Sequence, residues 1–171
     1  MAERKRRPRK TPAAPPRPSW MSERDYEKLA YLYREDSKLT KMRISREHEW
    51  PPEDQAVRRW AFEGFECAVS RGALSLCGYV AVMPGHPWHG KLINQVKVLV
   101  HGGLTFCCKG IAGRWWFGFN TGHEGDWIQM SDRHGKPTID IPGRIWTVAD
   151  LSLETEKLAL QAAHAMEKKS G

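Results

Sequence analysis

The sequence lacks three features: a hydrophobic run long enough to span a bilayer, a C-x-x-C pair and an internal repeat. These absences argue against a membrane-spanning helix, a closed zinc site of common spacing and a solenoid. Of the four cysteines, Cys107 and Cys108 are adjacent and would face opposite sides of a strand. No apolar segment follows the N-terminal charges, so we expect no secretory signal, a cytoplasmic location and reduced, mostly buried thiols. A catalytic Cys–His pair is an alternative for one of the thiols.

Positive charge is concentrated at the N-terminus. Residues 1–18 hold seven Lys and Arg, one acidic residue and five of the eleven prolines. Such a segment has too little apolar surface to fold, so residues 1–19 are predicted to be a disordered basic tail. The tail either contacts nucleic acid weakly through residues 4–17 or only keeps the protein in solution. The rest of the chain is nearly neutral and suits one domain over residues 20–169.

Helical patterns occur at both ends of this domain. Ser22 and Asp25 resemble a capping box that starts a helix over about residues 22–36. Pro52 and two acidic residues predict a second helix, whose apolar positions would be Ala56, Val57, Trp60 and Ala61. Thr147 and Asp150 form a capping box before a C-terminal helix with Leu151, Leu158, Ala162 and Ala165 on its apolar side.

Extended patterns occupy the middle of the chain. FECAVS and LSLCGYVAV predict a hairpin that turns at Arg71-Gly72, and LTFCC and RWWFGF predict a second one. Residues 95–101 alternate strictly and predict a strand with three valines on one face, whereas residues 128–146 are predicted to make an excursion over the surface. Together these elements predict an α+β fold: an antiparallel or mixed sheet of about five strands, N-terminal helices, and a C-terminal helix packed on the sheet.

Histidines gather beside glycines at the predicted strand ends. They are His86, His89, His101 and His123, and Asp126 follows the last of them. Imidazoles and a carboxylate are ligands for Zn or another divalent transition metal, although their spacing matches no closed zinc motif. Without a metal, the same groups would form an acid–base or anion-binding pocket. The alternative for any single histidine is a structural hydrogen bond at the rim of the sheet.

Cations, glycines and tryptophans near these histidines suggest how a ligand would be held. Lys91 or Arg114 would meet a negative charge, and backbone N–H groups at Gly102-Gly103 would form an anion-binding nest. Trp88, Trp116 or Trp127 would cover a planar ring, with ordinary aromatic packing as the alternative. On the RWWFGF strand, Trp115 and alternate residues would face the core, and Trp116 would face the other side.

Residues 60–162 resemble a family of small phage, plasmid and bacterial proteins. The segments that carry the resemblance are GYVAVMPGHPWHGK, VHGGLTF, WWFGFNTGHEGD and LETEKLALQ. The chain departs from the family pattern at Asn120, where the family has Asp, and at His89, where it often has an aromatic residue. The resemblance implies a phage or mobile-element setting in a bacterial host and leaves His86, His101, His123 and Asp126 as the site candidates.

The sequence therefore predicts a phage or mobile-element accessory protein with a polar, aromatic-rimmed pocket for a small anionic, nucleotide-like ligand. One alternative is a metal-assisted or histidine acid–base hydrolase acting on a nucleotide-type substrate. Another is a nucleic-acid-associated accessory protein acting through the basic tail. The pattern does not decide between binding and turnover, and it gives no oligomeric state.

Overall fold

The chain divides into two units, residues 1–41 and 42–171. The computed structural model describes residues 23–24, 27, 47–72, 74–132 and 134–170. Of the helix predicted over residues 22–36, it describes only Glu23, Arg24 and Glu27, and all three are helical. The rest of that helix, the tail over residues 1–19 and the predicted domain start at residue 20 lie outside the described residues.

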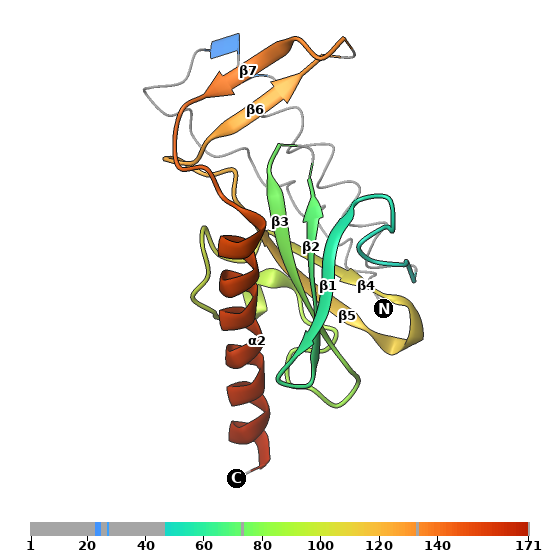
Figure 1. Cartoon of the computed structure of the whole chain (residues 1–171). Helices are drawn as coiled ribbons and strands as arrows, with labels where there is room; N and C mark the ends of the chain where they lie inside the picture. Colours follow the sequence, from blue (N-terminus) through green and yellow to red (C-terminus); the bar gives the residue numbers. More distant parts are fainter. Residues whose placement is uncertain (1–22, 25–26, 28–46, 73, 133, 171) are drawn as a thin grey trace, which may run out of the picture. The chain divides into compact units, whose positions relative to one another are not determined.

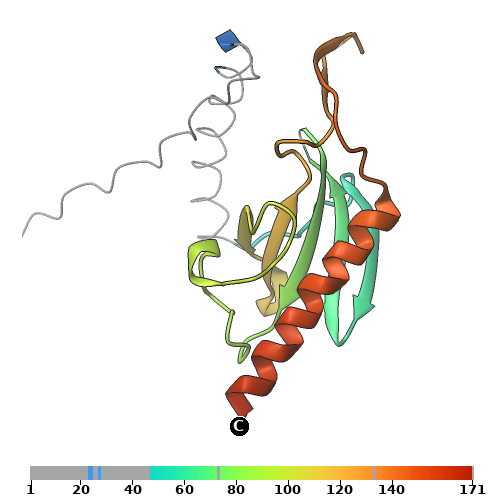
Figure 2. The same ribbon diagram turned by 90° about the vertical axis from the view of Figure 1, so that its left-hand side faces the viewer.

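The second unit is built on a five-stranded antiparallel sheet with a long helix across one face (Figures 1 and 2). The strands, in the spatial order β1-β2-β3-β5-β4, are β1 (Ala56–Phe62), β2 (Phe65–Arg71), β3 (Leu76–Val82), β5 (Trp115–Asn120) and β4 (Phe106–Lys109). Short 3-10 turns, η1 (Ile93–Gln95) and η2 (Ile111–Gly113), lie in the connections. The predicted α+β class and a sheet of about five strands are confirmed.

Both predicted hairpins of the main sheet form. β2 pairs with β3, and the turn begins at Gly72, whose N–H donates to the Ser75 carbonyl over 2.8 Å. β4 pairs with β5 through the connection that contains η2. These strands were predictable because their turn residues and their β-branched and aromatic content agree.

The helix predicted to start at Pro52 is wrong, because its residues form edge strand β1. The Pro52 carbonyl instead accepts backbone hydrogen bonds from Gln55 and Ala56, so the acidic segment forms a turn. β1 then pairs with β2 from Ala56 to Phe62, with one register shift. Trp60 and Phe62 alternate onto the core side. A short apolar pattern fits either period, and here pairing with a distant strand decides it.

The strand predicted over residues 95–101 does not form, although its side chains alternate as predicted. No strand of the described residues pairs with this segment. Val96, Val98 and Val100 nevertheless pack against the core, whereas Leu99 is 87% exposed. Side chains of the C-terminal helix take the place of a neighbouring strand, since Gln161 bonds both backbone groups of Leu99.

Helix α2 (Val148–Ser170) confirms the predicted C-terminal helix and its capping box. The Asp150 N–H donates to the Thr147 hydroxyl over 3.1 Å, and Asp150 Oδ2 accepts from the Thr147 N–H over 3.0 Å. The Thr147 hydroxyl also donates to Asp150 Oδ2 over 2.6 Å, and the two hydrogen bonds that this carboxylate accepts from Thr147 lower the pKa of Asp150. Leu151, Leu158 and Ala162 are fully buried against the sheet. The helix thereby closes the main core.

The two faces of the sheet carry separate clusters. Trp115, Phe117 and Phe119 face α2 within the larger cluster, as predicted. The smaller cluster on the other face contains Ala68, Tyr79, Ala81, Phe106, Cys108 and Trp116. Trp116 is only 1% exposed, and a Cβ at Gly118 would overlap the Tyr79 ring. Trp116 is therefore buried, and the Tyr79 ring fills the space over the neighbouring Gly118.

A second sheet occupies part of the predicted surface excursion over residues 128–146. Strands β6 (Ile128–Ser131) and β7 (Pro137–Ile141) form an antiparallel hairpin, and Ile128 and Ile139 are buried. The chain then returns beside the loop that follows β5, with reciprocal backbone bonds between Arg144 and residues 125 and 127. This return determines the composition of the candidate site.

Candidate functional site

His101, His123, Asp126 and Trp146 meet at one place, although they come from three segments. His101 ends the extended segment over residues 96–101, His123 and Asp126 lie in the loop between β5 and β6, and Trp146 precedes α2. The rings of His101 and His123 have centroids 5.3 Å apart, and those of His101 and Trp146 are 4.7 Å apart. We call these four residues the His–Asp cluster.

Asp126 is the centre of the cluster and is 2% exposed. Its Oδ2 lies 2.6 Å from His101 Nε2 and accepts the His123 backbone N–H over 3.0 Å. Its Oδ1 accepts the indole N–H of Trp146 over 2.8 Å. Burial by itself raises the pKa of a carboxyl, but the hydrogen bonds from Trp146, His101 and His123 outweigh it and lower the pKa of Asp126. Asp126 is therefore a fixed carboxylate at neutral pH.

His101 is oriented by this carboxylate. An ionised carboxylate can only accept, so Nε2 of His101 carries the proton that Asp126 binds. The other ring nitrogen, Nδ1, then has a lone pair that can take a proton. The His101 side chain is 26% exposed, so it is accessible to a small molecule in a way that buried Asp126 is not.

His123 is packed more tightly than His101. Burial and the neighbouring His101 lower its pKa, against the opposing effects of Asp126 and a hydrogen bond with the Asn120 backbone. Its Nε2 is buried without a hydrogen-bond partner among the described residues. Gly102 makes room for the ring, because a Cβ there would overlap it. His123 therefore stays neutral to lower pH than an ordinary histidine.

The loop geometry follows from short backbone contacts. Asn120 Oδ1 accepts the Gly122 N–H over 3.0 Å, which turns the chain at the end of β5. Farther on, Trp127 N–H donates to the Arg144 carbonyl and Arg144 N–H donates to the Gly125 carbonyl. A Cβ at Gly143 would overlap the Asp126 backbone, so only glycine allows this approach. The returning chain thereby brings Trp146 to Asp126.

Two other predicted histidines lie apart from the cluster. His86 is 7% exposed, and its ring nitrogens lie 3.0 Å from the Ala162 carbonyl and 3.0 Å from the Trp88 N–H. Nε2 of His89 lies 2.9 Å from the Gly113 carbonyl. Both rings are thus hydrogen-bonded to backbone groups, which is the structural alternative considered for single histidines.

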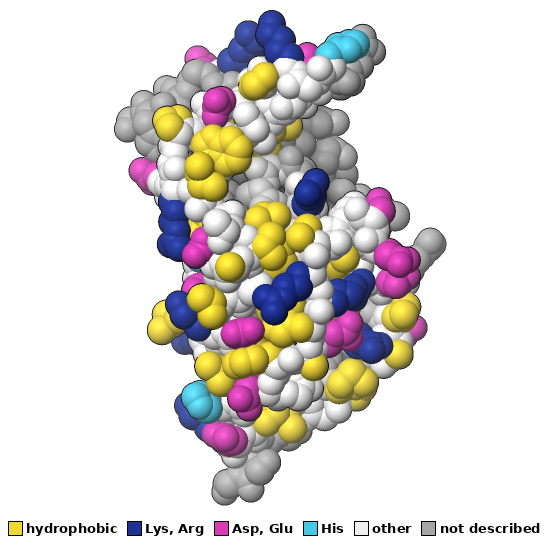
Figure 3. Space-filling model, viewed as in Figure 1, with side chains coloured by type: hydrophobic (Ala, Val, Ile, Leu, Met, Phe, Trp, Pro, Cys, Tyr) yellow, Lys and Arg dark blue, Asp and Glu magenta, His cyan; other side chains and the backbone are white. Residues whose placement is uncertain are grey.

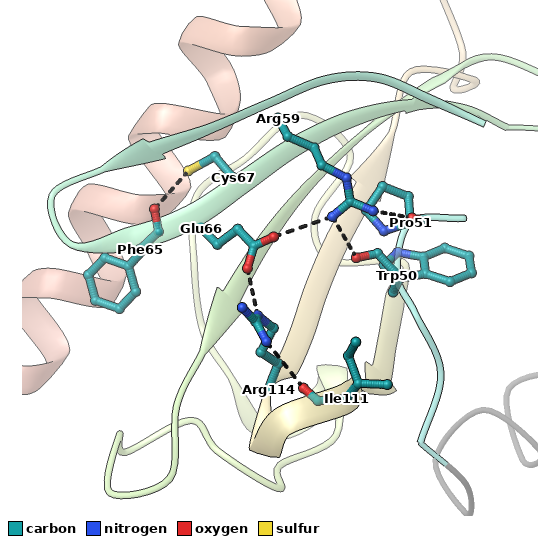
Figure 4. A network of polar contacts seen from close by, with 8 residues as sticks. All are labelled: Trp50, Pro51, Arg59, Phe65, Glu66, Cys67, Ile111 and Arg114. Atoms are coloured by element: carbon teal, nitrogen blue, oxygen red, sulfur yellow. Dashed lines mark hydrogen bonds and ion pairs between the residues drawn. The ribbon is translucent and has the colours of Figure 1, made fainter. Parts of the chain in front are cut away.

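The residues proposed to meet a negative charge also lie elsewhere. Arg114 donates from Nε to Glu66 over 2.6 Å, and Glu66 is bridged on its other oxygen to Arg59 (Figure 4). Lys91 is exposed, and its carbonyl accepts the Trp115 indole N–H over 2.9 Å. Of the predicted glycine pair, Gly102 touches the cluster, whereas Gly103 has open space around it.

The predicted ring-covering tryptophans have other surroundings. Trp88 is buried in the main core, and Trp116 is buried in the smaller cluster. Trp127 is 37% exposed and donates its indole N–H to Asp140 over 3.0 Å. The tryptophan that reaches the cluster is Trp146, which the sequence reasoning missed because it counted residues 128–146 as a surface segment. The sequence feature that could have pointed to Trp146 is its position just before the helix cap at Thr147.

Metal and thiol chemistry find little support in the side-chain geometry. Among the described residues, no three His, Cys, Asp or Glu side chains are grouped so that they could hold a metal ion. Cys67, Cys107 and Cys108 are buried, as predicted. Burial, with nearby Glu156 and Glu66, raises the pKa of Cys67 to about 12, and burial also raises the pKa of Cys107. These two thiols are poor nucleophiles at neutral pH.

Comparison with protein-family models, with curated proteins and with solved structures gives no match. The resemblance to phage, plasmid and bacterial proteins therefore stays a prediction. Within the described part of the chain, no helix combines the length and apolar character needed to cross a membrane. The His–Asp cluster is thus the feature of the molecule that bears most directly on its function.

Proposed function

We propose that the protein is a histidine acid–base hydrolase acting on a small nucleotide-type substrate. The observation that carries the proposal is the 2.6 Å contact between His101 Nε2 and the buried Asp126 carboxylate. A buried carboxylate that holds one imidazole nitrogen fixes the tautomer and stabilises the imidazolium once the other nitrogen takes a proton.

The chemistry assigned to each residue follows from its contacts. His101 Nδ1 takes a proton from water as the water attacks the substrate, and then returns that proton to the leaving group. Asp126 stays ionised throughout and balances the charge of the imidazolium. Trp146 and the His123 backbone N–H hold the two carboxylate oxygens, so Asp126 does not rotate away from His101.

The positions of the cations indicate which of them could meet a substrate phosphate. A binding pocket was expected to use Lys91 or Arg114, but Arg114 is paired with Glu66 away from the cluster. The cation beside the cluster is exposed Arg144, whose guanidinium lies 3.8 Å from the centre of the Trp146 ring. We assign Arg144 to a substrate phosphate. Because Arg144 could also bind an anion that is not hydrolysed, ligand binding without turnover is the second candidate function.

A phosphorus NMR assay of the full chain tests the proposal. Nucleoside mono-, di- and triphosphates and cyclic nucleotides are incubated with the protein and with the variants His101→Ala and Asp126→Asn. Loss of the acid–base group is expected to lower turnover by about 10²–10⁴-fold. His164→Gln, on the exposed side of α2, is the matched control and should leave the rate unchanged.

Two outcomes remove the histidine acid–base hydrolase, and two further results would point to one of the alternatives. Wild-type protein that turns over none of these compounds removes it, as does a His101→Ala variant as active as the wild type. Binding without turnover, measured by calorimetry and lost in an Arg144→Gln variant, would establish the ligand-binding alternative. Turnover that EDTA abolishes and zinc or manganese restores would replace the metal-free mechanism with the metal-assisted one.

The nucleic-acid alternative rests on residues 4–17, which lie outside the described residues. Charges of both signs are interspersed over the face of the body shown in Figure 3, so that face offers no continuous basic surface. A variant without residues 1–18 separates the two parts of the chain. DNA affinity that disappears with the deletion assigns the contact to the tail, and affinity that remains assigns it to the body.

A further inference from the structure

The segment that ends at His101 is held by side chains of a helix. Leu99 donates its N–H to Gln161 Oε1 over 2.7 Å, and its carbonyl accepts from Gln161 Nε2 over 3.0 Å. Two residues farther on, the His101 N–H donates to Glu154 Oε1 over 3.0 Å. Both side chains belong to α2, which lies across one face of the main sheet (Figure 2).

The spacing of these contacts matches two periodicities. Glu154 and Gln161 are seven residues apart, which places them two turns apart on one side of α2. Leu99 and His101 are two residues apart, so their backbone groups point to the same side of an extended segment. A primary amide places an N–H donor beside a carbonyl acceptor, as a neighbouring strand does for a peptide group, and it keeps a second N–H for another partner.

The same contacts fix the register of the segment. A shift of one residue would turn the Leu99 groups away from Gln161 and would move Val96, Val98 and Val100 out of the core. The two side chains are themselves held in place. Glu154 Oε2 accepts from Lys157 Nζ over 2.9 Å, and Gln161 Nε2 also donates to the Lys157 carbonyl over 3.1 Å.

We infer that Glu154 and Gln161 are positioning residues that set the register of residues 99–101 and so place the His101 imidazole against Asp126. The inference rests on the proposed function for its catalytic consequence, because only there does the position of His101 govern a rate. Glu154 acts through the backbone N–H of His101, and Gln161 acts through the backbone of Leu99.

Nuclear magnetic resonance of the full chain tests this positioning without a substrate. Glu154→Met and Gln161→Met remove the contacts and keep the side-chain length, and Glu154→Gln keeps an acceptor oxygen for the His101 N–H. Glu167→Met, an exposed position on the same helix, is the matched control. The readouts are hydrogen exchange at the Leu99 and His101 amides and the resonance of the His101 Nε2 proton bound to Asp126.

The two Met variants are expected to speed exchange at these amides by about tenfold relative to Phe117 in the core, since each loses a backbone hydrogen bond. The Nε2 proton should broaden or shift in both. Glu154→Gln should recover most of the protection, and Glu167→Met should match the wild type.

Unchanged exchange and an unchanged Nε2 resonance in both Met variants would overturn the inference. So would equal changes in Glu167→Met, because they would reflect the helix in general. These readouts do not need turnover, so a protein that hydrolyses no nucleotide would fail the proposed function and still show whether α2 positions His101. If turnover is found, Gln161→Met should lower kcat more than it raises KM.

Discussion

Gly102 is the residue whose side-chain volume the candidate site limits most directly. Its backbone N–H is predicted to meet an anion, and the structure adds that its missing side chain leaves space for the His123 ring. Its φ of +65° also lies in the left-handed region, which favours glycine. Two separate constraints thus act on one position.

Gly102→Ala is predicted to destabilise the protein by about 2–4 kcal/mol, through a left-handed alanine and an overlap with His123. Gly103→Ala is the matched control, because Gly103 has a φ of +76° and no neighbour near its Cβ position. It should cost only about 1 kcal/mol. Urea unfolding measures both. Equal losses in the two variants would show that His123 does not restrict Gly102.

Asp126 and Trp146 show that the neighbours of a histidine define its chemistry. A carboxylate with three hydrogen bonds is a fixed acceptor, and this turns His101 from a rim histidine into one with a defined tautomer. The tautomer of His86 is fixed as well, but by backbone groups inside the core, which engage both of its ring nitrogens. Neighbouring groups, and not the residue type, separate the two histidines.

Helix α2 approaches the sheet closely over Gly78 on β3. A Cβ at Gly78 would overlap the Thr155 hydroxyl and lie 2.8 Å from the Phe119 ring. Thr155 meanwhile donates its hydroxyl to the Leu151 carbonyl over 2.7 Å, so this buried hydroxyl is hydrogen-bonded. The helix can therefore lie low enough for Glu154 and Gln161 to reach the segment that carries His101.

Gly78→Ala is predicted to cost about 1–3 kcal/mol of unfolding free energy, because the methyl group would overfill a closely packed contact. Gly122→Ala is the control. The nearest neighbour of its Cβ is the Ser75 hydroxyl at 3.2 Å, which can rotate, and the cost should stay below about 1 kcal/mol. Thermal unfolding followed by circular dichroism compares them, and a Gly78→Ala protein as stable as the control would contradict the close approach.

The whole molecule should lose stability in acid in two stages. The pKa of His123 is lowered in the folded protein, so the unfolded chain binds the proton more tightly. Its contribution is complete above the unfolded pKa of about 6.5 and declines as the pH falls through that value. The pKa of Asp126 is also lowered, and its contribution is lost only at lower pH, below the unfolded value of about 3.9.

The free energy of unfolding, measured with urea from pH 8 to pH 4, shows the first stage. It is expected to fall by at most about 1.4 kcal/mol per pH unit because of this histidine. His123→Asn should make the free energy of unfolding fall less steeply between pH 6.5 and the pKa of His123 in the folded protein. His164→Asn, on the exposed side of α2, is the matched control for the loss of a histidine. A His123→Asn protein whose pH dependence matches the wild type would show that this histidine is not the source.

The sequence by itself determined the elements whose signals are local. The capping box at Thr147, the turn at Gly72 and the alternation of Trp115, Phe117 and Phe119 each depend on residues close together in the chain. These features are decided by hydrogen bonds and side-chain periods over a few residues. For the same reason, the sequence could place His101, His123 and Asp126 at element ends as site candidates.

Only the tertiary structure decided which residues meet. β1 became a strand because β2 pairs with it, and residues 96–101 stayed outside the sheet because Gln161 and Glu154 bond their backbone. Trp146 joined Asp126, whereas His86 turned into the core and Arg114 turned to Glu66. Each of these outcomes depends on contacts between residues distant in the chain, and the local pattern of residues carries no information about such contacts.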